Sequence, residues 1–120
     1  MNRRFILLAG AASLCLPASL SVAHAHLLTA TPGAGSTISI FPARLVCTFS
    51  EALEPTLCRL EVRDAAGARI DDGPMTISAD KKQIDVALRP TGPGDYAVTW
   101  VAVSVDTHRT AGSFRFTVRG

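Results

Sequence analysis

The stretch Asp95-Tyr96-Ala97-Val98-Thr99-Trp100-Val101-Ala102-Val103-Ser104-Val105 is the longest run in the chain that has the pattern of a β-strand. Tyr96, Val98 and Trp100 occupy every second position, and Ala102 continues the series. An alternation with a period of two places one set of side chains on one face of a strand and the other set on the opposite face. The stretch therefore predicts a long strand whose aromatic and aliphatic face lies in a hydrophobic core.

Shorter runs of the same kind lie on both sides of this stretch. In residues 44–50, for example, Leu45, Cys47 and Phe49 share one face. We expect further strands at Leu27–Thr31, Thr37–Ile40, Arg44–Ser50, Leu57–Arg63, Met75–Ser78, Gln83–Leu88 and Ser113–Val118. Residues that favour turns separate these runs, and we expect turns at residues 65–67, 71–73, 91–94 and 109–112.

The spacing of these runs indicates the class of fold. Seven or eight short strands with regular turns, and no helical periodicity of useful length, occur in residues 24–120. This combination is typical of an antiparallel β-sandwich. We found no internal repeat, low-complexity segment or linker, so the sequence predicts one all-β domain over residues 24–120.

Residues 1–23 have the pattern of an export signal. Arg3 and Arg4 precede a short apolar run from Phe5 to Leu16, and small residues follow it. The run is too short to be a good membrane span, so we interpret residues 1–23 as a signal peptide. Cleavage after Ala23 and cleavage after Ala25 both satisfy the small-x-small rule. Either one predicts passage across a membrane to a periplasmic or extracellular destination.

The charge of the chain limits the classes of partner. Of the 12 Lys and Arg residues, two are Arg3 and Arg4 of the signal, so 10 remain against 10 Asp and Glu. A nucleic-acid-binding protein needs a basic face, and a mature chain that is nearly neutral gives no indication of one. We therefore expect no nucleic-acid partner.

The cysteines leave one question open. Cys15 lies in the predicted signal, so the mature chain keeps Cys47 and Cys58. Two cysteines in an oxidising compartment can form a disulfide. However, Cys47 alternates with Leu45 and Phe49 and has the pattern of a core position. The sequence alone does not decide between a disulfide and two free thiols.

All three histidines of the chain fall into two pairs that have the spacing of metal ligands. His24 and His26 project to the same side of an extended segment, and Asp106 and His108 have the same spacing directly after the long strand. Imidazole nitrogen suits Cu(II), Ni(II) and Zn(II), and Cu(II) stands highest in the affinity series. The alternative is that these residues only end a signal, cap a turn and line a solvated loop. Spacing does not show that the two pairs meet.

Cleavage after Ala23 would add the free amine of His24 to this set and allow two modes of binding. In one mode, His24 binds through its amine and ring, and the other side chains complete the site. In the other mode, a planar chelate forms from the amine, two deprotonated backbone amides and the imidazole of His26. Cu(II) displaces amide protons readily, so the sequence leaves both modes open.

Several of these segments together resemble the CopC family of periplasmic copper-resistance proteins. The matching residues are His24-Ala25-His26-Leu27 with Ala30-Thr31-Pro32, the segment from Leu45 to Phe49-Ser50-Glu51, Gly94-Asp95-Tyr96 with Trp100, and Val103-Ser104-Val105-Asp106-Thr107-His108 with Gly112-Ser113. The resemblance covers the whole predicted mature chain. No single segment is specific, but the combination of an N-terminal histidine, Phe-Ser-Glu and Ser-Val-Asp-Thr-His is.

The resemblance implies an immunoglobulin-like Greek-key β-sandwich that binds one Cu(II) ion. His24 matches the terminal histidine of the family, which supplies amine and ring, and this match favours cleavage after Ala23. His26 matches the second histidine of members that begin His-x-His, and Asp106 and His108 match the ligands of the loop. Glu51 matches an acidic residue that either supports the site or is only a solvated strand end.

The sequence departs from some members of the family in its methionines. Those members carry a Met-rich loop for Cu(I), whereas this chain has Met75 alone after the signal. Sulfur ligands select Cu(I), while nitrogen and oxygen ligands suit Cu(II). We therefore predict one Cu(II) site and no dedicated Cu(I) site.

The resemblance leads to a functional hypothesis. We expect a monomeric, non-enzymatic periplasmic Cu(II)-binding protein for copper resistance and homeostasis. It would sequester copper or pass it to an inner-membrane copper transport protein of the CopD type. One alternative is a copper-dependent oxidative enzyme that uses an N-terminal histidine chelate, and another is an interaction module that binds no metal.

Overall fold

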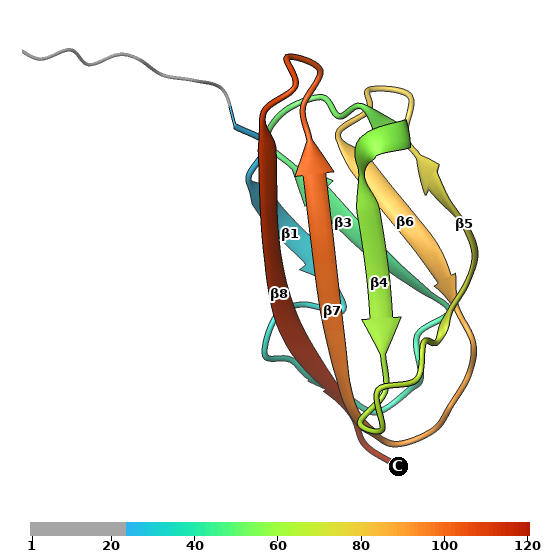
Figure 1. Ribbon diagram of the computed structural model, residues 1–120. Helices are drawn as coiled ribbons and strands as arrows, with labels where there is room; N and C mark the ends of the chain where they lie inside the picture. Colours follow the sequence, from blue (N-terminus) through green and yellow to red (C-terminus); the bar gives the residue numbers. More distant parts are fainter. Residues whose placement is uncertain (1–23) are drawn as a thin grey trace, which may run out of the picture.

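The computed structural model describes residues 24–120, in which two four-stranded sheets pack face to face (Figure 1). The predicted signal peptide lies outside the described residues. One sheet has the order β1-β3-β6-β5 and the other has the order β2-β8-β7-β4. The strands are β1 (Leu27–Thr31), β2 (Thr37–Ile38), β3 (Arg44–Phe49), β4 (Arg59–Arg63), β5 (Asp71–Ile77), β6 (Gln83–Leu88), β7 (Gly94–Val103) and β8 (Arg109–Val118).

The order of the strands is that of an immunoglobulin-like sandwich. Immunoglobulin domains place strands A, B, E and D in one sheet and strands C, F and G in the other. Here β1, β3, β6 and β5 take the first four places, and β4, β7 and β8 take the last three. The short β2 adds a parallel pair with β8, while the other pairs within the sheets are antiparallel. The predicted immunoglobulin-like antiparallel β-sandwich is therefore confirmed.

The core lies between the facing sides of the two sheets. Alternate residues of β3, β6 and β7 point into it, and Leu45, Cys47 and Phe49 are fully buried. Trp100 is half-buried and meets Phe49 edge to face, with 5.2 Å between the ring centroids. Burying a large apolar side chain contributes about 1.5–3 kcal/mol, so these alternating residues hold the two sheets together.

Tyr96 fixes the start of β7 as a tyrosine corner. Its ring stacks on Phe116 with 5.3 Å between the centroids, and its hydroxyl donates a hydrogen bond to the carbonyl of Gly92. In immunoglobulin-like folds the corresponding tyrosine bonds back to the backbone a few residues upstream. This contact anchors the strand that leads to the loop of Asp106.

Two of the predicted turns are parts of strands. Asp71-Asp72-Gly73 begins β5 because Asp71 pairs with Leu88 of β6. The residues from Arg109 to Gly112 begin β8, where Arg109 pairs with Val103 and the turn itself occupies residues 104–108. Turn-forming composition was misleading in both places because pairing in the ladder overrides local preference.

Gly112 is required for a close approach rather than for a turn. It pairs with Trp100, and a Cβ at this position would lie 2.6 Å from Cζ2 of the indole. Only glycine leaves room for the ring at that point.

The predicted strand from Leu57 to Arg63 begins later than expected, because Pro55–Leu57 forms a 3₁₀ turn before β4.

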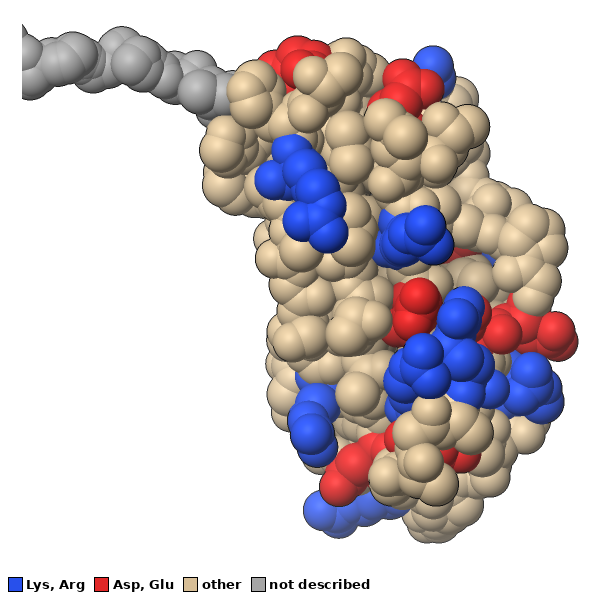
Figure 2. Space-filling view, in the orientation of Figure 1, with Lys and Arg blue, Asp and Glu red and all other residues tan. Residues whose placement is uncertain are grey.

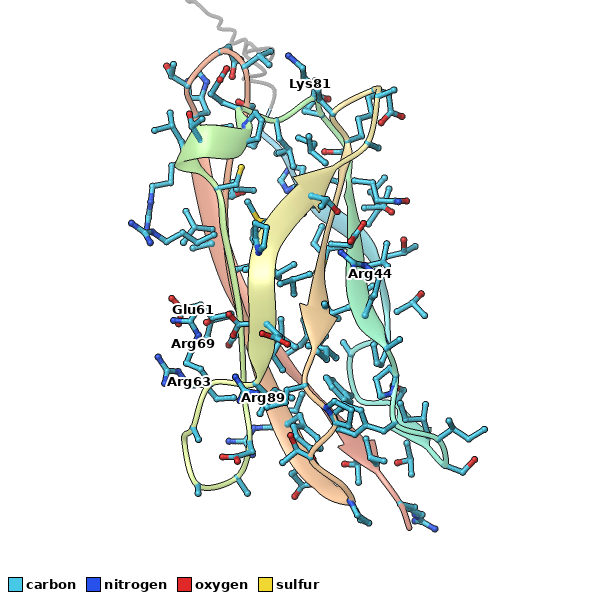
Figure 3. The ribbon with its side chains drawn as sticks, turned by 90° about the vertical axis from the view of Figure 1, so that its right-hand side faces the viewer. Arg44, Glu61, Arg63, Arg69, Lys81 and Arg89 are labelled. Carbon is cyan, nitrogen blue, oxygen red and sulfur yellow. The ribbon has the colours of Figure 1, made fainter. Side chains whose placement is uncertain are left out.

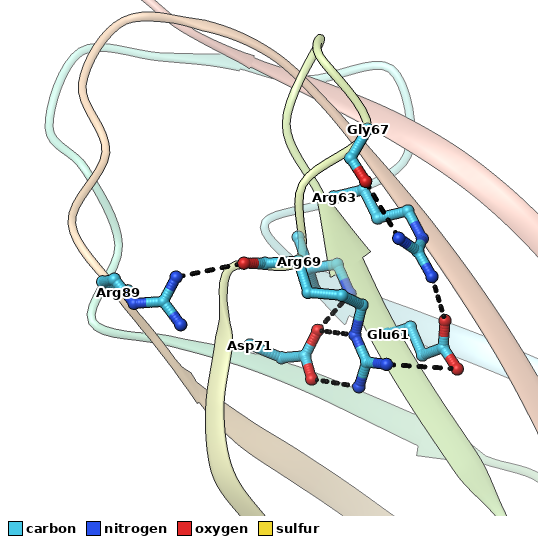
Figure 4. A network of polar contacts seen from close by, with 7 residues as sticks. Glu61, Arg63, Gly67, Arg69, Asp71 and Arg89 are labelled. Atoms are coloured by element: carbon cyan, nitrogen blue, oxygen red, sulfur yellow. Dashed lines mark hydrogen bonds and ion pairs between the residues drawn. The ribbon is translucent and has the colours of Figure 1, made fainter.

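A charged network ties β4 to the beginning of β5 (Figure 4). Arg69 binds Asp71 through two hydrogen bonds of 2.8 and 2.6 Å, and Arg69 and Arg63 both contact Glu61. Arg89 donates a hydrogen bond to the carbonyl of Arg69. In the side view of Figure 3 this network lies well away from Lys81, which marks the end of the sandwich that carries the loop of Asp106.

The two cysteines of the described chain are free and buried. Burial raises the pKa of the Cys47 thiol to about 12. The backbone N–H of Val103 donates to Sγ of Cys58, which in turn donates to the carbonyl of Glu54. The sequence did not decide between a disulfide and two free thiols, and in the structure Cys47 and Cys58 are two free thiols.

Residues 24–120 contain no helix that is long and apolar enough to cross a membrane.

Candidate metal centre

The residues just before β1 pack against the sandwich. Ala25 is fully buried in the core, and the hydroxyl of Thr110 donates a 2.7 Å hydrogen bond to its carbonyl. Thr110 lies at the start of β8, next to the loop that carries Asp106. Figure 1 shows the beginning of the described chain beside the loop that joins β7 and β8. Because Ala25 is held in the core, its neighbours His24 and His26 lie at this end of the molecule.

Ser50, directly after β3, holds both histidines through the backbone. Its N–H donates to the carbonyl of His26 at 2.9 Å, and the N–H of His26 donates back to its Oγ at 2.8 Å. Its hydroxyl donates to the carbonyl of His24 at 3.1 Å. One serine thus fixes the main chain on both sides of Ala25.

The loop of residues 104–108 is fixed by hydrogen bonds within the loop and by one hydrogen bond to the chain that follows β3. Ser104 is buried, and its N–H donates to the carbonyl of His108 at 3.0 Å. Thr107 takes a positive φ of 71° and donates its N–H to the carbonyl of Ser104. The N–H of Val105 donates to the carbonyl of Ala52, two residues after Ser50. The loop and the N-terminal segment are therefore both hydrogen-bonded to the same stretch of chain after β3, residues 50–52.

The fold brings the four predicted site residues into one cluster. The rings of His24 and His108 stack with 5.3 Å between their centroids, and the rings of His24 and His26 are 6.2 Å apart. Nδ1 of His108 lies 3.1 Å from Oδ1 of Asp106. The side chains of His108 and Asp106 are 45% and 48% exposed, so the cluster is open to solvent.

The environment of Asp106 favours its ionised form. The hydroxyl of Ser104 donates a hydrogen bond to Oδ1 of Asp106, and the imidazole of His108 is a second partner of that oxygen. The hydrogen bond from Ser104 is the larger cause and the contact with His108 the smaller one, and together they hold the pKa of Asp106 below its usual range. A carboxylate therefore stands beside the imidazole of His108 at neutral pH. Figure 2 shows acidic side chains at the end of the molecule where the described chain begins, with a basic side chain near them and most of the Lys and Arg side chains farther down the face in view.

The chemistry of this donor set fits a divalent ion of the copper type. Imidazole nitrogen and carboxylate oxygen are ligands that Cu(II) accepts in a tetragonal arrangement. Within residues 24–120, however, no group of three or more His, Cys, Asp or Glu side chains is already arranged to hold a metal ion. Because His24 and His108 stack face to face, their rings must rotate to aim nitrogens at a common ion. Rotamer changes of exposed side chains are fast, on the order of picoseconds to nanoseconds.

Sequence reasoning missed the residues that support the cluster. Ser50 and Thr110 bond the backbone of the N-terminal segment, and Ser104 bonds Asp106. Ser50 and Ser104 were indicated only as members of the matching segments Phe-Ser-Glu and Ser-Val-Asp-Thr-His, with no supporting role assigned to either. Glu51 is half-buried directly after Ser50, and its supporting role stays a prediction. Met75, the one methionine after the predicted signal, packs against the hydrophobic core.

An immunoglobulin-like sandwich with histidines and a carboxylate gathered at one end has the architecture of a small metal-binding protein. Residues 27–119 match the model of the CopC domain. The chain therefore belongs to the CopC family, whose named members include copper resistance and copper transport proteins. The resemblance inferred from the sequence is confirmed.

Three relatives illustrate the match. Copper resistance protein C of Pseudomonas syringae pv. tomato is 32% identical over 111 residues, which cover 87% of each chain. Copper transport protein CutJ of Bacillus subtilis (strain 168) is 32% identical over 100 residues, which cover 82% of this chain and 18% of CutJ. The crystal structure of CopC from Methylosinus trichosporium OB3b has a TM-score of 0.73 at 26% identity and covers 79% of this chain and 93% of that one. The relatives are named for copper resistance and transport, not as enzymes, in agreement with the non-enzymatic prediction.

Proposed function

We propose that the mature chain binds one Cu(II) ion through His24, His26, Asp106 and His108. The observation that carries this proposal is the 5.3 Å stacking of His24 on His108, which come from opposite ends of the described chain. A scaffold whose only purpose is stability has no need to gather solvent-exposed imidazoles from two distant segments. Their nitrogens, with the ionised carboxylate of Asp106, suit Cu(II) better than the sulfur-seeking Cu(I).

The structure of the N-terminal segment supports cleavage after Ala23. Cleavage after Ala25 would remove His24, and it would also remove a fully buried residue together with its hydrogen bond to Thr110. Cleavage after Ala23 keeps both and leaves a free amine on His24. That amine and the imidazole of the same residue can chelate one ion, which adds a nitrogen ligand to the site.

We propose that the protein acts in copper resistance and homeostasis in the periplasm, where it sequesters copper or passes it to a membrane protein of the CopD type. The half-exposed side chains of Asp106 and His108 support a site that a partner reaches directly. CutJ supports the link to transport, because a segment similar to this chain makes up only 18% of that copper transport protein. Ligand exchange at an open site allows transfer without unfolding of the sandwich.

A copper titration of the exported protein tests the proposal. The protein is purified from the periplasm, its N-terminus is checked by mass, and Cu(II) is added while EPR and Trp100 fluorescence are recorded. Matched samples carry His108→Ala, one extra residue before His24, or Thr99→Ala as an exposed control in the middle of β7. We expect one equivalent to bind tightly, with weaker binding in the first two samples and unchanged binding in the control. Absence of binding to the unmodified protein would refute the proposal.

A further inference from the structure

Ser50 occupies a position that decides between the two modes of copper binding that the sequence leaves open. We infer that its hydroxyl is a positioning group, which keeps the backbone of His26 away from the metal and thereby commits copper to the side chains of both chain ends. The inference rests on the proposed function, in which the mature chain begins at His24. It goes beyond that function because it states which nitrogens of residues 24–26 are available.

The hydrogen bond donated by His26 is the first argument. A planar chelate requires four nitrogens: the His24 amine, the backbone nitrogens of Ala25 and His26, and the His26 ring. The metal must replace the proton on each backbone nitrogen. In the structure the N–H of His26 donates to Oγ of Ser50 at 2.8 Å. A metal on this nitrogen would replace that proton, so Oγ of Ser50 would lose the hydrogen bond that it accepts from His26.

The anchoring of Ala25 is the second argument. A planar chelate wraps the peptide units on both sides of residue 25 around a single ion. Here the carbonyl of His24 accepts from Ser50, the carbonyl of Ala25 accepts from Thr110, and the side chain of Ala25 is fully buried in the core. Wrapping these peptide units around an ion would break all three contacts together. The folded segment therefore favours binding through side chains.

The choice of mode has a consequence for the rest of the site. A planar chelate fills four positions around the ion with nitrogens of residues 24–26 and needs neither Asp106 nor His108. Binding through side chains requires the loop, so the sandwich must be folded for copper to be held tightly. It also disfavours Ni(II), which a planar chelate of amide nitrogens binds as a square-planar, diamagnetic complex. Ser50 thus links metal selectivity to the fold.

The test compares spectra rather than affinity alone. The samples are the exported protein with His24 at its N-terminus, Ser50→Ala, Ser50→Thr and the control Ser113→Ala, whose side chain is exposed on β8. A synthetic peptide of residues 24–28 with a free amine supplies the reference spectrum of the unconstrained chelate. Each sample receives one equivalent of Cu(II) for EPR and, separately, Ni(II) for absorption and magnetic measurement. Circular dichroism without metal checks the fold of each variant.

We expect the unmodified protein, Ser50→Thr and Ser113→Ala to share one EPR spectrum that differs from that of the peptide. Ser50→Ala should gain the peptide-type spectrum and form the diamagnetic Ni(II) complex. A peptide-type spectrum from the unmodified protein would overturn the inference, as would an unchanged spectrum from Ser50→Ala or a peptide-type spectrum from Ser50→Thr. If Ser50→Ala fails to fold, the comparison of the unmodified protein with the peptide decides.

These outcomes separate the inference from the proposed function. Failure of the unmodified protein to bind Cu(II) would refute both. Tight binding with a peptide-type spectrum would refute only the role of Ser50 and leave copper binding in place. Tight binding with a distinct spectrum that changes in His108→Ala supports both.

Discussion

His24 stacks on His108 with 5.3 Å between the ring centroids and 26° between the ring planes. The first residue precedes β1 of one sheet, and the second ends the loop between β7 and β8 of the other. The two sheets must be packed correctly for these rings to meet. The proposed copper site is therefore a property of the whole sandwich and not of either segment alone.

Replacing His108 tests this dependence directly. His108→Ala removes one imidazole and the ring partner of Asp106, so we expect the Cu(II) affinity to fall at least tenfold, which corresponds to about 1.4 kcal/mol. Competition with a chelator of known affinity measures the change, and Thr99→Ala should match the unmodified protein. Equal affinities for His108→Ala and the control would remove His108 from the site.

Ser104 should matter for copper although it is buried and has no contact with the ion in our proposal. Its hydroxyl bonds Oδ1 of Asp106 and orients that carboxylate. Loss of a group that orients a metal ligand costs roughly 10–100-fold in affinity. We therefore expect Ser104→Ala to weaken Cu(II) binding by about that factor, as measured by the same competition. An affinity equal to that of Ser113→Ala would show that the orientation of Asp106 is fixed by other contacts.

The fold was more accessible from the sequence than the site was. Alternation in residues 44–50 and 95–105 predicted a short and a long strand, because each has one buried face. The predicted turn at residues 109–112 was wrong, because Gly112 lies in a strand and is needed there to make room for the ring of Trp100. Local composition cannot distinguish a glycine needed for packing from one needed for a turn.

For the site, the spacing of the histidines identified the candidates but not their neighbours. His24, His26, Asp106 and His108 were chosen by residue type, and only the packing of two sheets brings them together. Ser50 and Thr110 could not be chosen in that way, because a hydroxyl that bonds backbone has no periodicity or characteristic spacing. Their role depends on which segments the fold makes adjacent.

The N-terminal segment should contribute to stability as well as to copper binding. Thr110→Val keeps the shape of the side chain but removes the hydroxyl that bonds the carbonyl of Ala25. A hydrogen bond of this kind contributes about 0.5–1.5 kcal/mol, so we expect the free energy of unfolding to fall by roughly 1 kcal/mol. Urea unfolding without metal measures it. A variant that begins at His26 lacks the same bond, so a Thr110→Val change in that background should have a smaller effect.

Gly112→Ala should destabilise the protein through a steric clash. The added Cβ would lie 2.6 Å from the Trp100 ring, so either the indole or the β7–β8 pair must move. Overpacking of this kind costs about 1–3 kcal/mol. Urea unfolding measures the loss, and the emission of Trp100 should shift because it is the only tryptophan. Ala111→Gly at the exposed neighbouring position should leave the emission unchanged, and an unshifted spectrum in Gly112→Ala would contradict the proposed clash.

Asp71 should make stability depend on acid pH. Burial opposes ionisation of this carboxyl, whose side chain is 8% exposed. Hydrogen bonds from Arg69 and from the N–H of Val62 outweigh burial and hold the pKa of Asp71 below its usual range. A carboxyl with a lowered pKa in the folded state stabilises the protein above its unfolded pKa. That contribution disappears as the pH falls through the lower, folded value.

Asp71→Asn should therefore lower the free energy of unfolding at pH 7 by roughly 1–2 kcal/mol, since a hydrogen bond to a charged group contributes about 1.5–3 kcal/mol and Arg69 is partly exposed. The difference from the unmodified protein should shrink as the pH falls through the acid range. Urea unfolding at a series of pH values measures both quantities. Asp72→Asn, the exposed neighbour, serves as the control. A difference between Asp71→Asn and the unmodified protein that stays constant down to low pH would mean that Asp71 stabilises β5 through shape and not through its charge.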